Sequence, residues 1–351
     1  MNFIITLLIL FLMLSIIIFI HEFGHFITAK KCGVYVDEFS LGMGPVIFKH
    51  KPKNSETTYS LRIFPIGGFV SMAEKVIPNT KIKKDQVLEN KNVFQKLTVL
   101  LMGIVMNFIL AIVLFFISGL LYGKPVDEPV VGSILEGSPA YVSGLESGDT
   151  ILQINSVKIN NWDDILLEIS AKELKDNYEF VVKKNDGTTK TYNIVPLIEE
   201  TEDGEKRTFG IGSSPTKYEK GFLSAVEYAF EGFYSTIVTI IRVVGSLFTG
   251  EVALDSLSGP VGIYSIIDQL KEQGLQIIIY LTAYLSVNVG VINLLPIPVF
   301  DGGRVLLVLI EKITKKKTSE KLEAIINYIG FGMMILLMLY VTFNDIINLI
   351  R

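Results

Sequence analysis

Two histidines and a glutamate near the N-terminus have the residue types and the spacing of a catalytic metal site. His21 and His25 are four residues apart, so on a helix both imidazoles lie on one face and can bind a single zinc ion. Glu22 follows His21 directly and is placed to act as a general base toward the attacking water. A surface helix that carries two histidines by chance is the alternative. The metal site is favoured because the motif ends an apolar segment, where ionisable side chains are costly and usually functional.

A catalytic zinc ion normally has three protein ligands and one open position, so a third ligand is needed. The only other histidine, His50, lies in a Lys-rich segment that has the composition of a solvated loop, and it is the weaker candidate. Asp301 is favoured because it follows an apolar segment and two prolines within residues 293–302. Irregular backbone at membrane depth is tolerated only where it is buried or lines a wet cavity. The alternative role for Asp301 is to cap a helix that begins near Gly302.

The composition indicates an integral membrane protein. Half of the 351 residues are hydrophobic, only 19% are charged, and the mean hydropathy is +0.46, which is more apolar than an ordinary soluble domain of this length. The net charge is -4 and no long basic block occurs, which argues against a nucleic-acid partner. The single cysteine, Cys32, excludes an intrachain disulfide and a Cys-rich metal site.

Four apolar segments are long enough to cross the hydrocarbon core of a membrane, which takes about 20 residues. They cover residues 1–20, 97–122, 275–300 and 324–344. The first lacks a basic start and a small-residue cleavage site, and it runs straight into the histidine motif, so a removable signal peptide is the weaker interpretation. The sequence therefore predicts an α-helical integral membrane protein with about four transmembrane helices.

Lysines concentrate in the two connections that follow the first and the third apolar segments. By the positive-inside rule both connections are cytoplasmic, which places both chain ends outside and the histidine motif toward the cytoplasmic side. A fifth apolar stretch, residues 222–248, contains Glu227, Glu231 and Arg242, and its insertion would move one Lys-rich connection outside. We therefore interpret this stretch as an amphipathic helix that lies on the membrane or packs against the bundle.

The chain changes character after the second apolar segment. Short β-like runs such as residues 150–155 alternate with turn residues such as Gly137 and Gly148, which is typical of a small soluble domain with mixed α/β structure. We accordingly divide the chain into an N-terminal membrane part, an extracytoplasmic domain, a linker with membrane-surface helices, and a C-terminal membrane part. Their predicted bounds are 1–122, 123–200, 201–274 and 275–351.

Further motifs accompany the histidine motif and the Asp301-Gly302 motif. They are Leu-Arg-Ile-Phe-Pro-Ile-Gly-Gly-Phe-Val-Ser-Met at residues 61–72, Gly-Ile-Val-Met-Asn at 103–107, and Leu-Ser-Gly-Pro-Val-Gly-Ile at 257–263. With these motifs the sequence resembles, over most of its length, the site-2 protease family of intramembrane zinc metalloproteases. It is most similar to the bacterial branch typified by the regulator of sigma-E protease. One departure is Phe300, which stands where that family usually has Leu before Asp-Gly.

The resemblance implies specific roles for residues of the matching motifs. It implies a Zn²⁺ ion bound by His21, His25 and Asp301, with Glu22 as the catalytic acid and base, and substrate contacts at Asn288, Asn293, Gly67, Gly68 and Phe69. Interhelical hydrogen bonds that only stabilise packing are the alternative for the two asparagines, and Asn107 is interpreted as structural.

Residues 61–72 resemble the family's membrane-associated β-hairpin, with Gly67 and Gly68 at the turn. A substrate helix must unwind before it is cleaved, and the edge of this hairpin can pair with the freed backbone groups by strand addition. An ordinary cytosolic hairpin is the alternative.

The soluble segment resembles a single PDZ domain, with residues 131–135 as its peptide-binding strand. The resemblance implies regulated intramembrane proteolysis in the plasma (inner) membrane of a bacterium. The implied partners are the lipid bilayer and single-pass membrane proteins that were trimmed outside, such as an anti-sigma factor or a signal-peptide remnant. Two alternatives stay open: a non-catalytic membrane scaffold that binds peptides through its PDZ domain, and a membrane metalloprotease of another class with a glutamate as third ligand.

Overall fold

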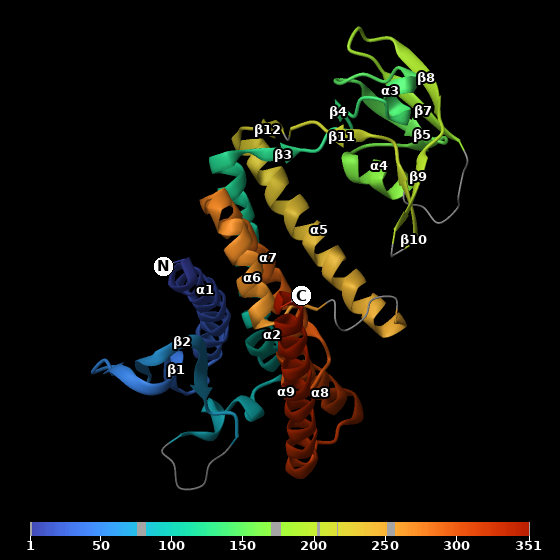
Figure 1. The fold of residues 1–351 in the computed structure, drawn as a ribbon. Coiled ribbons are helices and arrows are strands. Elements are labelled where there is room, and N and C mark those ends of the chain that lie inside the picture. The colour runs from blue at the N-terminus through green and yellow to red at the C-terminus, as the bar shows by residue number, and fades with distance from the viewer. Residues whose placement is uncertain are drawn as a thin grey trace. The chain divides into compact units, whose positions relative to one another are not determined.

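The computed structural model of the chain describes residues 2–75, 82–169, 177–201, 204–215, 217–250 and 257–350. It divides into two compact units (Figure 1). The first unit combines Met1–Tyr122 with Gly221–Arg351, and the second is Gly123–Lys220. Both ends of the chain thus belong to the same unit.

The first unit is built from seven helices of the described chain, joined by a few short 3-10 turns. The helices are α1 (Asn2–Lys31), α2 (Val93–Tyr122), α5 (Phe222–Thr249), α6 (Pro260–Leu270), α7 (Leu275–Leu294), α8 (Asp301–Thr314) and α9 (Glu320–Ile350), and the turns are η1 (Lys84–Gln86), η2 (Leu88–Asn90) and η4 (Lys271–Gln273). The predicted third membrane segment, 275–300, is helical only to Leu294, because the two prolines that follow cannot continue the helix.

Five of the described helices are long and apolar enough to cross a membrane. They are Phe3–Lys31, Val93–Tyr122, Phe222–Leu247, Leu275–Leu294 and Lys321–Ile347. Four of them contain or overlap the predicted spans, and the fifth is the stretch that we interpreted as amphipathic. Its length and apolarity meet the same criterion, so its three charged residues and the positions of the lysines are what favour a helix that does not cross the membrane. The structure therefore supports a membrane protein with several apolar helices.

Helix α2 lies at the centre of this unit and packs against α1, α5, α7 and α8. Small residues allow the closest approaches: a Cβ atom on Gly24 of α1 would lie 2.4 Å from the Met102 carbonyl oxygen, and one on Gly119 would lie 3.0 Å from the Cα atom of Ala225 in α5. Close backbone approach through small residues is how helices gain packing energy in lipid, where no hydrophobic force drives them together.

Strands β1 (Val36–His50) and β2 (Thr58–Met72) form a β-sheet next to α1 (Figure 1). Ser40 pairs with both Ser60 and Phe69, so the start of β1 lies between two segments of β2. The chain therefore reverses direction within β2, and Gly67, whose φ is +95°, lies in this reversal. The sequence located only the last part of the sheet, in residues 61–72.

The second unit is a mixed α/β domain. Its strands are β3 (Lys124–Val126), β4 (Val131–Ile134), β5 (Thr150–Ile154), β6 (Val157–Lys158), β7 (Tyr178–Lys183), β8 (Thr189–Ile194), β9 (Leu197–Thr201), β10 (Gly204–Thr208), β11 (Ile211–Ser213) and β12 (Lys217–Glu219), and its helices are α3 (Pro139–Ser143) and α4 (Trp162–Ile169). Four strands form a sheet in the order β6-β5-β7-β8 around a core that includes Ile151, Phe180 and Val182. The unit continues past residue 200, because β11 pairs with β4 and β12 pairs with β3.

Candidate metal centre

The two histidines of α1 and the aspartate that begins α8 converge on one point. The Nε2 atoms of His21 and His25 lie 3.1 and 3.2 Å from Oδ2 of Asp301, and 3.2 Å from each other. One ligand atom from each of the three residues lies within 4.8 Å of the others, and both imidazoles are buried. Two imidazole nitrogens and one carboxylate oxygen are a donor set that suits a catalytic zinc ion.

The outer nitrogen of His25 is fixed by the backbone of α2. Nδ1 donates a hydrogen bond of 2.8 Å to the Val99 carbonyl oxygen, and since a carbonyl only accepts, Nδ1 carries the proton. The lone pair of the imidazole is therefore on Nε2, which faces Asp301. A histidine ligand oriented by a second hydrogen bond in this way is the usual arrangement around a protein-bound metal.

The outer nitrogen of His21 faces Asn107, a fully buried residue of α2. Nδ2 of Asn107 lies 3.3 Å from Nδ1 of His21, and the amide oxygen of Asn107 has no hydrogen-bond partner. For Nε2 of His21 to bind a metal, Nδ1 must be protonated and needs an acceptor. The side-chain amide of Asn107 provides that acceptor when it is turned by 180°, because its oxygen then lies where Nδ2 was and faces Nδ1 of His21. Asn107 is thus placed to orient His21, a role beyond the structural one expected from the sequence.

Helix α2 can approach the two imidazoles only because residue 103 is glycine. A Cβ atom on Gly103 would lie 2.4 Å from Nε2 of His25 and 2.8 Å from Cε1 of His21. The motif Gly103-x-x-x-Asn107 therefore has a physical reason: one residue leaves space for the ligands, and the residue one turn later faces the outer nitrogen of His21. Two such residues on one face of an otherwise apolar helix are the signal by which this role could have been found in the sequence.

Asp301 is held by the irregular segment between α7 and α8. A Cβ atom on Gly302 would lie 2.2 Å from the Leu294 carbonyl oxygen, and one on Gly303 would lie 2.4 Å from the Ile297 carbonyl oxygen. The segment before Asp301 therefore folds back over the start of α8. Val299 has a φ of +85°, which is strained for a β-branched residue. Helix α8 begins at Asp301 with Phe300 as its N-cap, and the Asp301 carboxylate faces the imidazoles. The alternative role of Asp301 as the cap of this helix is therefore wrong.

Glu22 lies beside the last segment of β2. A Cβ atom on Gly68 would be 3.5 Å from Cγ of Glu22, and the Val70 backbone N–H is directed at the Glu22 carboxylate. The sheet thus brings residues 68–72 next to the candidate general base. Gly67 and Phe69 flank Gly68, and Phe69 lies under the guanidinium of Arg62 at 5.1 Å.

The remaining predicted residues have other surroundings. Nδ2 of Asn288 donates to the Tyr284 carbonyl oxygen within α7 at 2.9 Å, and Asn293 is half-buried at the end of the same helix. His50 is exposed at the end of β1, where it pairs with Tyr59, and it is not part of the cluster.

Comparison with known proteins gives the family of the chain. A family model described as Peptidase family M50 matches residues 9–337. The chain belongs to Peptidase family M50. The expected site-2 protease resemblance is confirmed by this match, and so is the expectation of a zinc-dependent metalloprotease.

Similar proteins of this family cover nearly the whole chain. The regulator of sigma-W protease RasP of Bacillus subtilis is 33% identical, over 94% of this chain and 95% of its own length. The zinc metalloprotease RasP of Bacillus licheniformis is 32% identical over 95% and 97% of the two chains. A putative zinc metalloprotease of Clostridium acetobutylicum is 35% identical over 95% of each.

Proposed function

We propose that the chain is a zinc endopeptidase that cleaves other membrane proteins within, or at the edge of, their transmembrane segments. The observation that carries this proposal is the convergence of His21, His25 and Asp301 at the end of an apolar helix, with Glu22 in the next position. Ionisable groups at such a place are costly unless they serve a site, and these three form a ligand set.

His21, His25 and Asp301 would hold the zinc ion, and Glu22 would move protons. Zinc bound there would supply a Lewis acid for the scissile carbonyl and favour ionisation of the attacking water. Glu22 takes the proton from that water and later delivers it to the leaving amine. Val99 and Asn107 keep the two imidazoles oriented, since they contact the nitrogens that face away from Asp301.

The last segment of β2 is the proposed binding edge for the unwound substrate. A transmembrane helix shields its peptide bonds, and once unwound its N–H and C=O groups need partners where water is scarce. Residues 68–72 lie beside Glu22, and a substrate strand added to them would run past the cluster. Gly67, Gly68, Phe69, Asn288 and Asn293 are the proposed contacts with the substrate.

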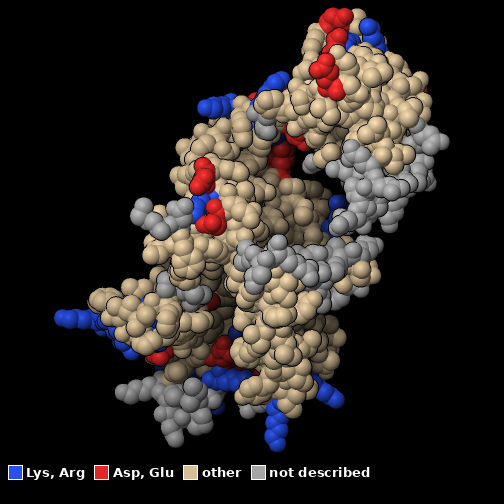
Figure 2. All heavy atoms as spheres, in the orientation of Figure 1, with Lys and Arg blue, Asp and Glu red and all other residues tan. Residues whose placement is uncertain are grey.

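We propose a topology in which both Lys-rich connections are cytoplasmic and the unit of residues 123–220 is extracytoplasmic. On the face shown in Figure 2 the long helices of the first unit are almost free of charged atoms, and lysines and arginines project where the hairpin, α8 and the start of α9 lie. By the positive-inside rule that end of the unit faces the cytoplasm of a bacterial cell.

The unit of residues 123–220 is proposed to be a PDZ-type domain that selects substrates already trimmed outside. Strand β4 pairs with β11, and the backbone of Val131 at its start also bonds with Gly148 and Asp149. A bound peptide strand is proposed to add to an edge of this strand pair, which contains the strand expected from the sequence. Regulated intramembrane proteolysis, such as release of an anti-sigma factor or clearance of signal-peptide remnants, is the biological role that we propose.

The decisive test compares the purified wild type with Glu22→Gln on a tagged single-pass substrate in detergent, with bound zinc quantified in both. We expect the variant to retain zinc and to lose cleavage, because the amide keeps the shape of Glu22 but cannot accept the proton. Equal cleavage by both proteins, or a wild type without zinc, would remove the catalytic assignment and favour the non-catalytic scaffold.

A further inference from the structure

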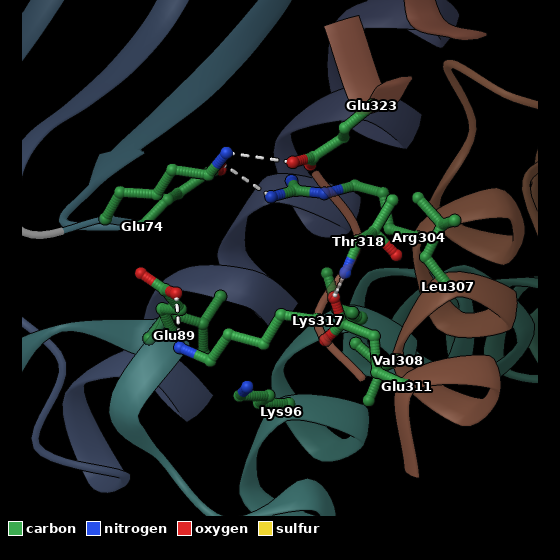
Figure 3. Close-up of a pocket in the computed structure, with 13 residues that line it drawn as sticks. Glu74, Glu89, Lys96, Arg304, Leu307, Val308, Glu311, Lys317, Thr318 and Glu323 are labelled. Carbon is green, nitrogen blue, oxygen red and sulfur yellow. Dashed lines mark hydrogen bonds and ion pairs between the residues drawn. The ribbon is translucent and has the colours of Figure 1, made fainter. Parts of the chain in front are cut away.

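Three ion pairs join the segment after β2, including η2, to α8, to α9 and to the connection between these two helices. Arg304 Nη2 lies 2.7 Å from Glu74 Oε2, Lys75 Nζ lies 2.8 Å from Glu323 Oε2, and Lys317 Nζ lies 2.6 Å from Glu89 Oε1. Figure 3 shows Glu74 facing Arg304 and Glu89 facing Lys317 at a cavity. The signs alternate on both sides, so each charge faces its opposite. We refer to these six residues as the charged seam.

On one side of the seam, Glu74 is a rigid continuation of the proposed substrate edge. It follows β2 by two residues, and the intervening Ala73 donates its N–H to the Tyr35 carbonyl oxygen at 2.9 Å. The carbonyl oxygens of Ala73 and Glu74 accept hydrogen bonds from Leu88 N (2.8 Å) and Glu89 N (3.0 Å). The backbone that carries the Glu74 carboxylate is therefore fixed, and a shift of Glu74 would shift residues 68–72 with it.

On the other side, Arg304 is rigidly connected to Asp301. The two residues are three apart in α8, so their side chains project from neighbouring positions on one face of the helix. The start of α8 is held by the close contacts of Gly302 and Gly303 with the preceding segment. A shift of Arg304 would therefore shift the candidate ligand Asp301.

Cavities lie on both sides of the Glu74–Arg304 pair, so packing adds little support to it. One cavity is lined by Leu88, Leu100 and Leu307. The other is lined by Val299, Tyr328 and Phe331, and Glu74, Arg304 and Glu323 line both. The pair thus bridges an incompletely filled space between the sheet region and α8.

We propose that Arg304 is a positioning residue for peptide cleavage, because its ion pair with Glu74 sets the distance between substrate edge 68–72 and Asp301. The proposal rests on the proposed function. The edge would hold the scissile bond while Asp301 holds the metal, and the two must be in register for reaction. A misplacement of about 1 Å in such an arrangement costs roughly 100-fold in rate.

The other two pairs of the seam are suitable controls. Glu323 and Lys317 belong to α9 and to the connection before it, which carry no residue of the site. The side chain of Lys317 is 69% exposed, against 37% for Arg304 and 47% for Glu74, and the contribution of an ion pair falls as its exposure rises. Loss of Lys317–Glu89 removes a charge pair from the same cavity and leaves the Glu74–Arg304 pair in place.

The test measures kcat, KM and bound zinc for full-length wild type, Arg304→Met, Arg304→Lys, Glu74→Gln and the Arg304→Met/Glu74→Gln double variant, with Lys317→Met as control. We expect kcat to fall about 10- to 100-fold in Arg304→Met and in Glu74→Gln, with zinc content unchanged. The double variant should be no worse than either single one, Arg304→Lys should recover part of the rate, and Lys317→Met should match the wild type.

Several results would overturn the proposal. They are wild-type kcat in Arg304→Met and Glu74→Gln, multiplied losses in the double variant, or an equal loss in Lys317→Met. Loss of zinc or of thermal stability in Arg304→Met would assign Arg304 a structural role instead. In that case the kcat of Glu74→Gln tests independently whether the ion pair positions the substrate edge. Failure of the proposed function itself is distinguishable, because the wild type would then not cleave or Glu22→Gln would cleave equally.

Discussion

Replacement of Gly103 by alanine tests whether α2 shapes the metal centre. The new Cβ would lie 2.4 Å from Nε2 of His25 and 2.8 Å from Cε1 of His21, against an ordinary contact of 3.4 Å. The imidazoles must therefore move by 3.4 − 2.4 = 1.0 Å and 3.4 − 2.8 = 0.6 Å, or the helices must separate. Metal sites tolerate deviations of only about 0.2 Å in ligand distance. We expect zinc affinity to fall by at least about 100-fold, since disturbing the surroundings of a ligand alone costs about 10- to 100-fold.

The assay is zinc retention against a competing chelator of known affinity, with cleavage and thermal unfolding measured on the same samples. Alanine favours a helix over glycine by about 1 kcal/mol, so the fold itself should not be lost through helix propensity. Gly245→Ala in α5 and Gly332→Ala in α9 are matched controls, because among the described residues no heavy atom beyond the nearby backbone of the same helix lies within 4 Å of their Cβ positions. Wild-type zinc affinity and cleavage in Gly103→Ala would refute the close packing of α2 against the histidines.

Three further predictions concern hydrogen-bonded polar side chains. Asn107→Leu should lower zinc affinity about 10- to 100-fold in the chelator assay, whereas Asn107→Asp, which keeps an acceptor for His21, should lower it less. Asp345→Ala should lower the free energy of unfolding by about 1 kcal/mol, because the carboxylate accepts the Gly259 and Gly262 N–H groups at the start of α6. In the second unit, a hydrogen bond from Lys184 lowers the pKa of Glu146 below its ordinary 4.5. The pair therefore stabilises the unit above this pH and less as the pH falls through the folded pKa, and hydrogen exchange in β5 and β7 should show an acid destabilisation that Lys184→Met reduces.

The metal cluster was accessible from sequence because its signals are local. The spacing of His21 and His25 fixes their common helix face, and the prolines before Asp301 mark the irregular backbone that carries it. The structure brings these three residues together. Their roles as ligands stay a prediction until zinc is measured in variants.

Long-range features were not accessible in the same way. The first strand of the β-sheet was missed because Asp37, Glu38 and two glycines interrupt its hydrophobic alternation, and its pairing with β2 depends on distant residues. Lys75 and Glu323 of the charged seam are 248 residues apart, and lysines and glutamates at such positions look like ordinary surface residues in a sequence. Asn107 was interpreted as structural because the sequence does not show which side chain lies opposite it.

The contacts between helices show that α5 can be embedded in the bundle while both Lys-rich connections stay on the same side of the membrane. Helices α1 and α2 run in opposite directions, since His25 contacts Val99 and His21 contacts Asn107. The start of α1 therefore lies at the same end as the end of α2.

Helix α5 begins beside the end of α2, where the rings of Phe222 and Phe116 are 5.6 Å apart. Helix α6 leads to Lys271, whose Nζ lies 2.7 Å from the Thr6 hydroxyl near the start of α1. A path that begins with α5 and finishes with α6 thus starts and ends at one end of the bundle, and it adds no net crossing. Even if α5 is embedded in the membrane, both Lys-rich connections then stay on the same side. The positive-inside rule therefore fixes how many times the chain crosses the membrane completely, but it does not fix how deeply α5 lies in it.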